Sequence, residues 1–158
     1  MADNDLDSFD LKILDALQSN AELSMAELGE KVGLSHTPCW RRVKRLEEAG
    51  YICGKVTLLN SKLLNLSVSV HAYITIKKHD EASLTAFESS VTPIPEIVEC
   101  YSITGEKDYL LRVVVSTVDA YEIFLKNTLV HLPNVASVNS VFALKQVKYT
   151  SRLPLKKA

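Results

Sequence analysis

A cluster of positive charge stands out between residues 35 and 46, where the sequence reads SHTPCWRRVKRL. The segment contains no acidic residue and four cationic ones: Arg41, Arg42, Lys44 and Arg45. The chain of 158 residues as a whole has a formal net charge of −1. Since phosphate groups bind clustered Lys and Arg side chains, any nucleic-acid binding must come from this local patch and not from net charge.

Helical periodicity sorts the residues of this segment onto two faces. At about 100° per residue, an apolar stripe is formed by Cys39, Val43 and Leu46. The opposite side carries polar and cationic side chains, namely Thr37, Arg41 and Lys44, flanked by Trp40 and Arg45. Arg42 lies at the edge of the stripe, where it can serve either DNA or an internal ion pair.

This arrangement is typical of a recognition helix. Residues near the start of such a helix reach base edges in the major groove, and basic residues further along neutralise phosphates. We therefore predict DNA contacts from Ser35, His36, Thr37, Trp40, Arg41, Arg42, Lys44 and Arg45. Two alternatives stay open: a charged helix face can simply be solvated, and the Trp40 ring can pack against a neighbouring subunit or a wing.

Two further helices are predicted ahead of the basic one. Residues 8–19 have apolar side chains at helical spacing, and Asp7 is a suitable N-cap. Ser24 and Glu27 have the spacing of a capping box and begin a short helix that ends at Gly33. The basic helix follows after about three residues, so the last two helices form a helix-turn-helix.

The basic helix is expected to begin at Ser35 as its N-cap, to run to about Ala49 and to stop at Gly50. The next residues, 51–60, read YICGKVTLLN and are expected to form a wing strand and linker. Residues 1–60 are therefore interpreted as a winged helix-turn-helix DNA-binding domain.

The second half of the chain has a different pattern. The stretch LSVSVHAYITIK, residues 66–77, alternates apolar and polar side chains and predicts a half-buried strand. Further helices and strands are expected, in order, at 81–91, 96–104, 108–116, 118–131 and 135–147. The fold class is therefore α+β, an N-terminal winged helix-turn-helix followed by a ferredoxin-like βαββαβ domain over 65–150 and a basic tail at 151–158.

Composition narrows the classes of protein. The chain is 47% hydrophobic and 23% charged, which is typical of a globular protein. No apolar run approaches the roughly 18 residues that span a bilayer, and the acidic N-terminus has no secretory signal. Cys39, Cys53 and Cys100 form no CxxC pair. These features favour a reducing cytoplasm and no membrane partner.

Neither a metal site nor an active site is predicted. His36, Cys39 and Cys53 fall short of the four ligands of a structural zinc site. The sequence has no P-loop, no G-x-G-x-x-G and no persuasive catalytic triad. Because His71, His79 and His131 are isolated along the chain, we interpret them as solvated or structural. The chain is expected to be no enzyme and to hold no cofactor.

Four segments, in order and at matching spacing, resemble the Lrp/AsnC family, the leucine-responsive and asparagine-responsive bacterial transcription regulators. They are DLKILDALQSNAELSMAELGEKVGLS, TPCWRRVKRLEEAGYI, ITGEKDYLLRV and ALKQVKYTSRLPL. The resemblance implies a sequence-specific regulator of promoter DNA, with a C-terminal effector domain of the RAM type that binds an amino acid such as leucine or methionine. It also implies a homodimer, rings of dimers that are often octamers, and a nucleoid-associated protein of the bacterial cytoplasm.

The same resemblance implies an effector loop at TGEKDY, where Gly105 is followed three residues later by Asp108. Glycine lets backbone N–H groups approach a carboxylate, and an aspartate pairs with an ammonium group. From the residues alone, a plain β-turn remains an alternative. Where the family commonly has Thr-x-Thr, this chain has Val138 and Ser140, which implies a more apolar pocket wall.

The effector residues are expected to be Ile103, Thr104, Gly105, Asp108, Val138 and Ser140. An alternative function also stays open. The chain can be an effector-binding regulatory subunit of a metabolic protein, with the helix-turn-helix used for protein contacts.

Overall fold

The computed structural model describes residues 6–155, which contain five α-helices, one short 3-10 helix and four strands. The chain divides into two compact units. One unit is formed by the described residues up to Leu58 together with those from Lys148 onward, and the other spans Leu59–Val147. Among the described residues, no helix has the length and apolar character needed to cross a bilayer.

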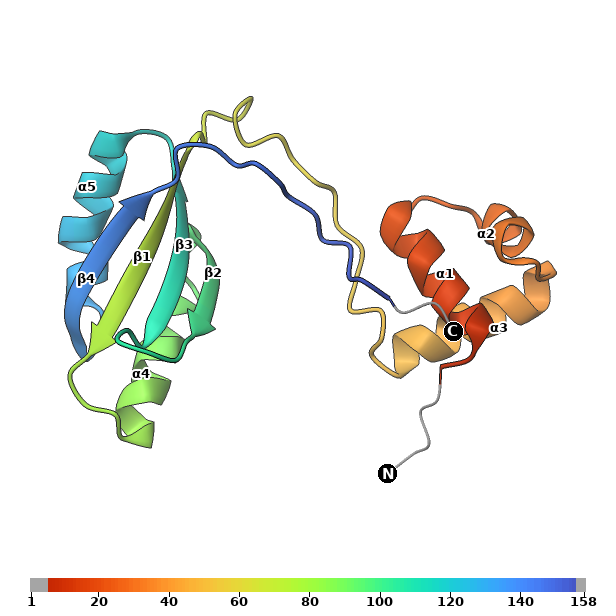
Figure 1. Cartoon of the computed structure of the whole chain (residues 1–158), viewed down its shortest axis with the longest axis horizontal. Helices are drawn as coiled ribbons and strands as arrows, with labels where there is room; N and C mark the ends of the chain where they lie inside the picture. The colour runs from red at the N-terminus through yellow and green to blue at the C-terminus, as the bar shows by residue number, and fades with distance from the viewer. Residues whose placement is uncertain (1–5, 156–158) are drawn as a thin grey trace. The chain divides into compact units, whose positions relative to one another are not determined.

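The first unit contains three helices, α1 (Ser8–Ser19), α2 (Met25–Val32) and α3 (His36–Glu48) (Figure 1). They match the three predicted helices closely. Their inward faces meet in one buried apolar cluster, consisting of Ile13, Ala16, Leu17, Leu28, Val32, Cys39, Val43 and Leu46. Burying such stripes against one another is what stabilises short amphipathic helices in water.

The predicted helix ends are confirmed, with one difference in capping. Asp7 and Ser24 form capping boxes at the starts of α1 and α2. Gly33 ends α2 in the left-handed conformation, with φ 78°. Ser35 occupies the N-cap position of α3, but its side chain makes no capping hydrogen bond.

The turn between α2 and α3 depends on a close backbone approach at Gly29. The Leu34 N–H donates to the Gly29 carbonyl at 2.9 Å. A Cβ atom added to Gly29 would lie only 2.6 Å from the Leu34 carbonyl oxygen. Because the Leu34 carbonyl oxygen is a backbone atom, a side chain at Gly29 cannot be accommodated by a simple rotamer change. The absence of a side chain at Gly29 therefore sets how closely the turn folds back.

The strand expected within residues 51–60 is not formed, so this prediction was wrong. Residues 52–60 have no regular secondary structure, and Val56 is 83% exposed. The apolar residues suggested a strand, but a strand needs a neighbour to pair its N–H and C=O groups. Within residues 6–155, no strand pairs with this segment.

The second unit has the predicted βαββαβ order. Its elements are β1 (Val68–Ile76), α4 (Glu81–Val91), β2 (Ile97–Ser102), β3 (Tyr109–Val115), α5 (Val118–Asn127), the 3-10 turn η1 (Leu129–His131) and β4 (Val135–Phe142). The strand order is β2-β3-β1-β4, with all neighbours antiparallel. Both α4 and α5 lie on one face of the sheet (Figure 1).

Alternation along the strands explains this one-sided packing. Every second residue of β1 and β3 is buried beneath the helices, and α4 and α5 contribute Phe87 and Tyr121 to the same core. Two predicted boundaries were too long. The helix from 118 gives way to η1 after Asn127, and the last strand ends at Phe142 instead of residue 147.

Candidate DNA interface and ligand loop

Helix α3 separates its apolar and cationic residues as its periodicity predicts. Cys39, Val43 and Leu46 are buried against α1 and α2. Their burial leaves the opposite face in solvent, where the exposed residues include His36, Thr37, Trp40, Arg41 and Lys44. The helix therefore presents a polar, positively charged surface that no other part of its unit covers.

Two cations on this surface are available to a partner. Within the described residues, Arg41 forms no hydrogen bond or ion pair. The Lys44 ammonium lies 5.8 Å from the centroid of the Trp40 ring, a cation–π contact at the surface. Since neither cation is neutralised by a carboxylate of the described chain, both can meet phosphate oxygens.

Two other cations of α3 are engaged inside the unit. The Arg42 guanidinium lies 2.6 Å from an Asp7 carboxylate oxygen and 2.8 Å from one of Asp10. Arg45 forms an ion pair with the other Asp10 oxygen. Asp10 is fully buried, so these contacts tie α3 to α1. The pKa of Arg42 is raised, first by its hydrogen bond to Asp10 and then by that to Asp7.

The eight predicted DNA-contact residues therefore fall into two groups. Ser35, His36, Thr37, Trp40, Arg41 and Lys44 are exposed and hold no internal ion pair. Arg42, at the edge of the apolar stripe, forms internal ion pairs with Asp7 and Asp10. Arg45 is also paired, but with its side chain 57% exposed it keeps part of its guanidinium outward.

Asp10 is a residue that the sequence reasoning missed. We placed it, with Lys12, Asp15 and Gln18, outside the apolar stripe of the first helix. Its spacing to Ile13 and Leu17, at i+3 and i+7, places it instead on the buried stripe. An acidic residue at that spacing, facing a helix rich in arginine, is the signal that points to a buried ion pair.

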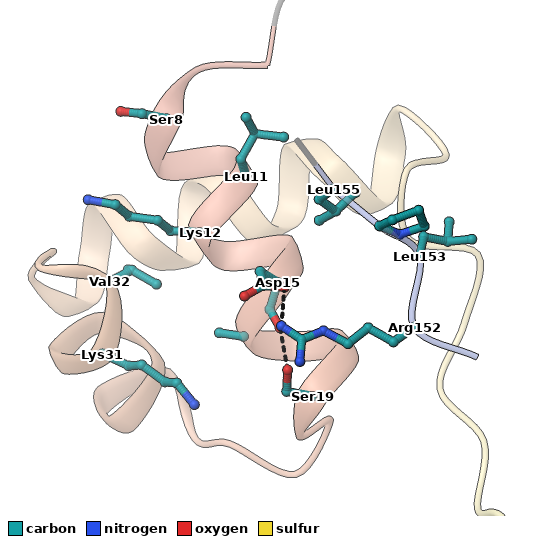
Figure 2. Close-up of a pocket in the computed structure, with 12 residues that line it drawn as sticks. Ser8, Leu11, Lys12, Asp15, Ser19, Lys31, Val32, Arg152, Leu153 and Leu155 are labelled. Atoms are coloured by element: carbon teal, nitrogen blue, oxygen red, sulfur yellow. Dashed lines mark hydrogen bonds and ion pairs between the residues drawn. The ribbon is translucent and has the colours of Figure 1, made fainter. Parts of the chain in front are cut away.

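Residues 152–155, at the end of the described chain, lie beside α1. Arg152 forms an ion pair with Asp15 at 2.7 Å. Leu153 exchanges two hydrogen bonds with the Gln18 amide, at 2.9 and 3.0 Å. Figure 2 shows this segment running beside α1, where it helps to line a pocket of about 680 Å³ between α1 and the end of α2. The tail is therefore fastened to the helical unit by side chains of α1.

In the second unit, the loop between β2 and β3 contains the predicted effector motif. Gly105 has φ 116°, a conformation that residues with a Cβ rarely adopt. The loop closes through a hydrogen bond from the Ile103 N–H to the Asp108 carbonyl, at 2.9 Å. The Asp108 N–H in turn donates to the Ile74 carbonyl of β1 at 2.9 Å. Gly105 is thus the bend that returns the chain to the sheet.

The Asp108 carboxylate holds two groups. One oxygen accepts from the Ile76 N–H at 2.7 Å, and the other lies 2.7 Å from Nε2 of His79. The pKa of Asp108 is lowered, mainly by the Ile76 N–H and further by His79 and by the charge of Lys107. The side chain remains 23% exposed. An anion at the end of β1 is therefore accessible to a cationic ligand.

Ile103, Thr104 and Gly105 lie in the same loop as Asp108, whereas Val138 and Ser140 lie apart from it. Val138 and Ser140 are on β4, and β1 lies between β4 and β3. With neighbouring strands about 4.8 Å apart, β3 and β4 are separated by roughly 10 Å. The Ser140 hydroxyl bonds to the Tyr121 hydroxyl of α5 at 2.6 Å. Within one chain, these residues and the Gly105 loop do not form one compact pocket.

The sequence predicted no metal site at His36, Cys39 and Cys53, and the structure shows where the two cysteines lie. Cys39 is buried in the helical core, whereas Cys53 is exposed beyond α3. Across residues 6–155, no group of three or more His, Cys, Asp or Glu side chains is placed to hold a metal ion.

A helix-turn-helix unit with an open cationic face, joined to an α+β unit with a ligand-type loop, defines a class: a DNA-binding regulator with its own ligand-binding domain. Comparison with known families agrees. Residues 6–52 match the winged helix-turn-helix DNA-binding family, and residues 69–153 match the Lrp/AsnC ligand binding domain. The chain belongs to the Lrp/AsnC family of transcription regulators. The predicted family, fold class and general function are thereby confirmed.

Relatives and solved structures match along almost the whole chain. The Bkd operon transcriptional regulator of Pseudomonas aeruginosa is 44% identical over 151 residues, which cover 96% of this chain and 99% of that protein. The transcriptional activator DecR of Escherichia coli is 39% identical over 150 residues, which cover 95% and 99%.

Among solved structures, a transcriptional regulator from Neisseria meningitidis in complex with L-Met is similar, with TM-score 0.90, 38% identity and coverage of 95% of this chain and 97% of that one. An AsnC family regulator from Agrobacterium tumefaciens has TM-score 0.89, 43% identity and coverage of 94% and 97%.

Proposed function

We propose that the outward face of α3 binds the major groove of promoter DNA, and that an amino acid bound at the Gly105–Asp108 loop changes this binding. The observation that carries the proposal is that some residues of α3 make contacts inside the unit while others remain exposed. Its apolar stripe and Arg42 are engaged inside the unit, whereas Arg41 and Lys44 remain exposed. Two exposed cations on one helix face, with no carboxylate of the described chain paired to them, suit a surface that binds phosphate groups.

The exposed residues suit two kinds of DNA contact. Small polar groups at the start of α3, including Thr37, are placed as base-edge readers are in recognition helices. Arg41 and Lys44, one to two turns further along, are placed to neutralise phosphates. In a dimer, two such helices would read half-sites about 34–36 Å apart, or a multiple of that spacing.

Asp108 is proposed to pair with the ammonium group of the effector, and the backbone near Gly105 to receive its carboxylate. The support is chemical. The carboxylate is a partly exposed anion near a glycine turn with positive φ, which suits a zwitterionic ligand. The similar regulator from Neisseria meningitidis was solved with L-Met, so methionine is a reasonable first effector to test, with leucine next.

Dimerisation is proposed through the face of the sheet that α4 and α5 leave uncovered. Tyr73 of β1 and Leu110 of β3 are directly paired on this face, and Tyr101 of β2, which pairs with Leu110, is 55% exposed. A contiguous apolar surface on one side of a sheet marks an interaction site. We propose that a homodimer forms on this face and that dimers assemble further into rings such as octamers. We also propose that the protein acts in the bacterial cytoplasm, where promoters lie, and that its role is regulatory and not catalytic.

Fluorescence anisotropy tests the DNA interface. A duplex selected from a random pool by the wild-type protein would be titrated with Arg41→Ala and Lys44→Ala at several salt concentrations. Each variant should bind more weakly and lower the slope of log affinity against log salt by about 1.8 per bound dimer, because each substitution removes one phosphate contact from both protomers. The matched control is Lys126→Ala, an exposed cation of α5. Unchanged slopes for both α3 variants would refute the interface.

A further inference from the structure

His79 is the side chain that already contacts the Asp108 carboxylate. Its Nε2 lies 2.7 Å from one Asp108 oxygen, and the other oxygen is capped by the Ile76 N–H. Asp108 is partly exposed at 23%, and the His79 side chain is more so at 61%. The imidazole is therefore the more solvent-exposed partner of this contact.

We propose that His79 is an additional residue of the effector site, which holds Asp108 when the site is empty and is displaced by the ammonium group of the bound amino acid. This inference rests on the proposed role of Asp108. A protonated imidazole and an ammonium group are both nitrogen cations that donate to a carboxylate. One oxygen cannot offer its best position to both, so the imidazole and the ammonium group compete.

The surrounding charged groups do not replace His79 in this role. From the loop, the Lys107 ammonium donates to the Thr75 hydroxyl at 3.2 Å, and Glu106 is exposed. From β1 and the connection to α4, Lys77 and Lys78 are exposed, and Asp80 is engaged as the N-cap of α4. Asn134, just before β4, is uncharged and bonds to the Lys78 backbone. Among the described residues, His79 is the one ion-pair partner of Asp108.

Competition with a histidine makes ligand binding depend on pH. Histidine is the side chain whose charge ordinarily changes between about pH 5 and 8. A protonated imidazole competes with the ammonium group for Asp108 better than a neutral one does, so amino-acid affinity should fall as the pH is lowered. For one competing proton, the limit is about a tenfold loss in affinity per pH unit.

The test is isothermal titration calorimetry on the full chain, with L-methionine and L-leucine as probes at about pH 5.5, 6.5 and 7.5. The wild-type protein should bind more tightly as the pH rises, by roughly tenfold across the range. His79→Gln keeps a neutral polar side chain and should bind with the same affinity at all three values, and more tightly than wild type at the lowest. The matched control, His131→Gln at the exposed end of η1, should keep the wild-type profile.

The outcomes separate this inference from the proposal beneath it. If Asp108→Asn abolishes binding while His79→Gln keeps the wild-type pH profile, Asp108 is an effector residue and the inference about His79 is overturned. If the wild-type protein binds neither probe nor any other standard amino acid, both the effector site and the inference fail. Circular dichroism would show that each variant remains folded.

Discussion

Asp10 and Asp108, one in each unit, both contact nitrogen-bearing side chains, but in different surroundings. Asp10 is fully buried, and its two oxygens bind Arg42 and Arg45. Asp108 lies at the surface end of a strand, and its oxygens bind a backbone N–H and a histidine. The first carboxylate joins two helices, whereas the second joins a loop to a histidine that we propose a ligand displaces.

The difference teaches which ion pairs suit a scaffold and which suit a switch. Arginine is not deprotonated in proteins, and a buried carboxylate deprived of its partner is costly. The contacts of Asp10 are therefore fixed, and they hold α3 at one angle to α1. Histidine loses its charge near neutral pH, and an exposed ion pair contributes little to stability. The contacts of Asp108 can therefore be exchanged without unfolding the unit.

Asp10→Asn removes the buried ion pairs of the helical unit and should have the largest effect on the free energy of unfolding. Removing one partner of a buried ion pair costs about 3 kcal/mol, the low end of the usual range because both arginines are partly exposed. Trp40 is the chain's one tryptophan, so its fluorescence during urea unfolding reports the helical unit. Asp7→Asn is the control, since the Asp7 side chain is 48% exposed and Asn is an equally good N-cap. Equal losses for the two variants would show that the burial of Asp10 is unimportant.

Gly29→Ala tests whether the helical unit is as rigid as the comparison requires. The new Cβ would meet the Leu34 carbonyl oxygen at 2.6 Å, and overpacking of this kind costs about 1–3 kcal/mol. The loss should appear in the Trp40 unfolding curve and in DNA affinity together. Gly54→Ala is the control, because nothing lies within 4 Å of its added Cβ. A neutral Gly29→Ala would mean that the turn adapts.

Gly105→Ala applies the same chemical change to the ligand loop, for a different physical reason. No atom lies within 4 Å of the added Cβ, but φ is 116°. We expect a loss of about 1 kcal/mol from backbone strain, confined to the second unit. Circular dichroism should show a lower midpoint in urea, whereas the Trp40 curve should be unchanged. A shift of both curves would contradict the separation of the two units.

Asp108→Asn should have the smallest effect, and one that depends on pH. The pKa of Asp108 is lowered from 3.8, so its ion pair and hydrogen bond stabilise the fold above that value. This contribution is lost as the pH falls from about 4 through the lowered pKa. Wild-type stability should therefore drop more steeply below pH 4 than that of the variant, as measured by urea titrations followed by circular dichroism. Parallel profiles would show that Asp108 contributes nothing to the folded state.

Local patterns predicted most of the fold. Capping residues at Asp7 and Ser24 and the stop at Gly33 placed the helices correctly, because these interactions form between neighbours in the sequence. Alternation from Val68 to Ile76 placed the first strand for the same reason. The wing strand was wrong because a strand exists only where a partner accepts its hydrogen bonds, and local pattern does not reveal the partner.

The candidate sites were predicted unevenly. The exposed face of α3 follows from one helix and its period, so Arg41 and Lys44 could be named in advance. The partners of Arg42 and Asp108 could not, because Asp10 is 32 residues from Arg42 and His79 is 29 residues from Asp108. Hydrogen bonds over such separations depend on how the elements pack.

By itself, then, the sequence determined the order of the elements, the buried stripe of α3, the glycine bend of the loop and the family. Each of these depends on spacing within a few residues or on likeness along the chain. Tertiary structure decided which cations form ion pairs inside the protein and which remain exposed, and which histidine contacts Asp108. These choices are made by side chains that only folding brings within hydrogen-bonding distance, and no local pattern records them.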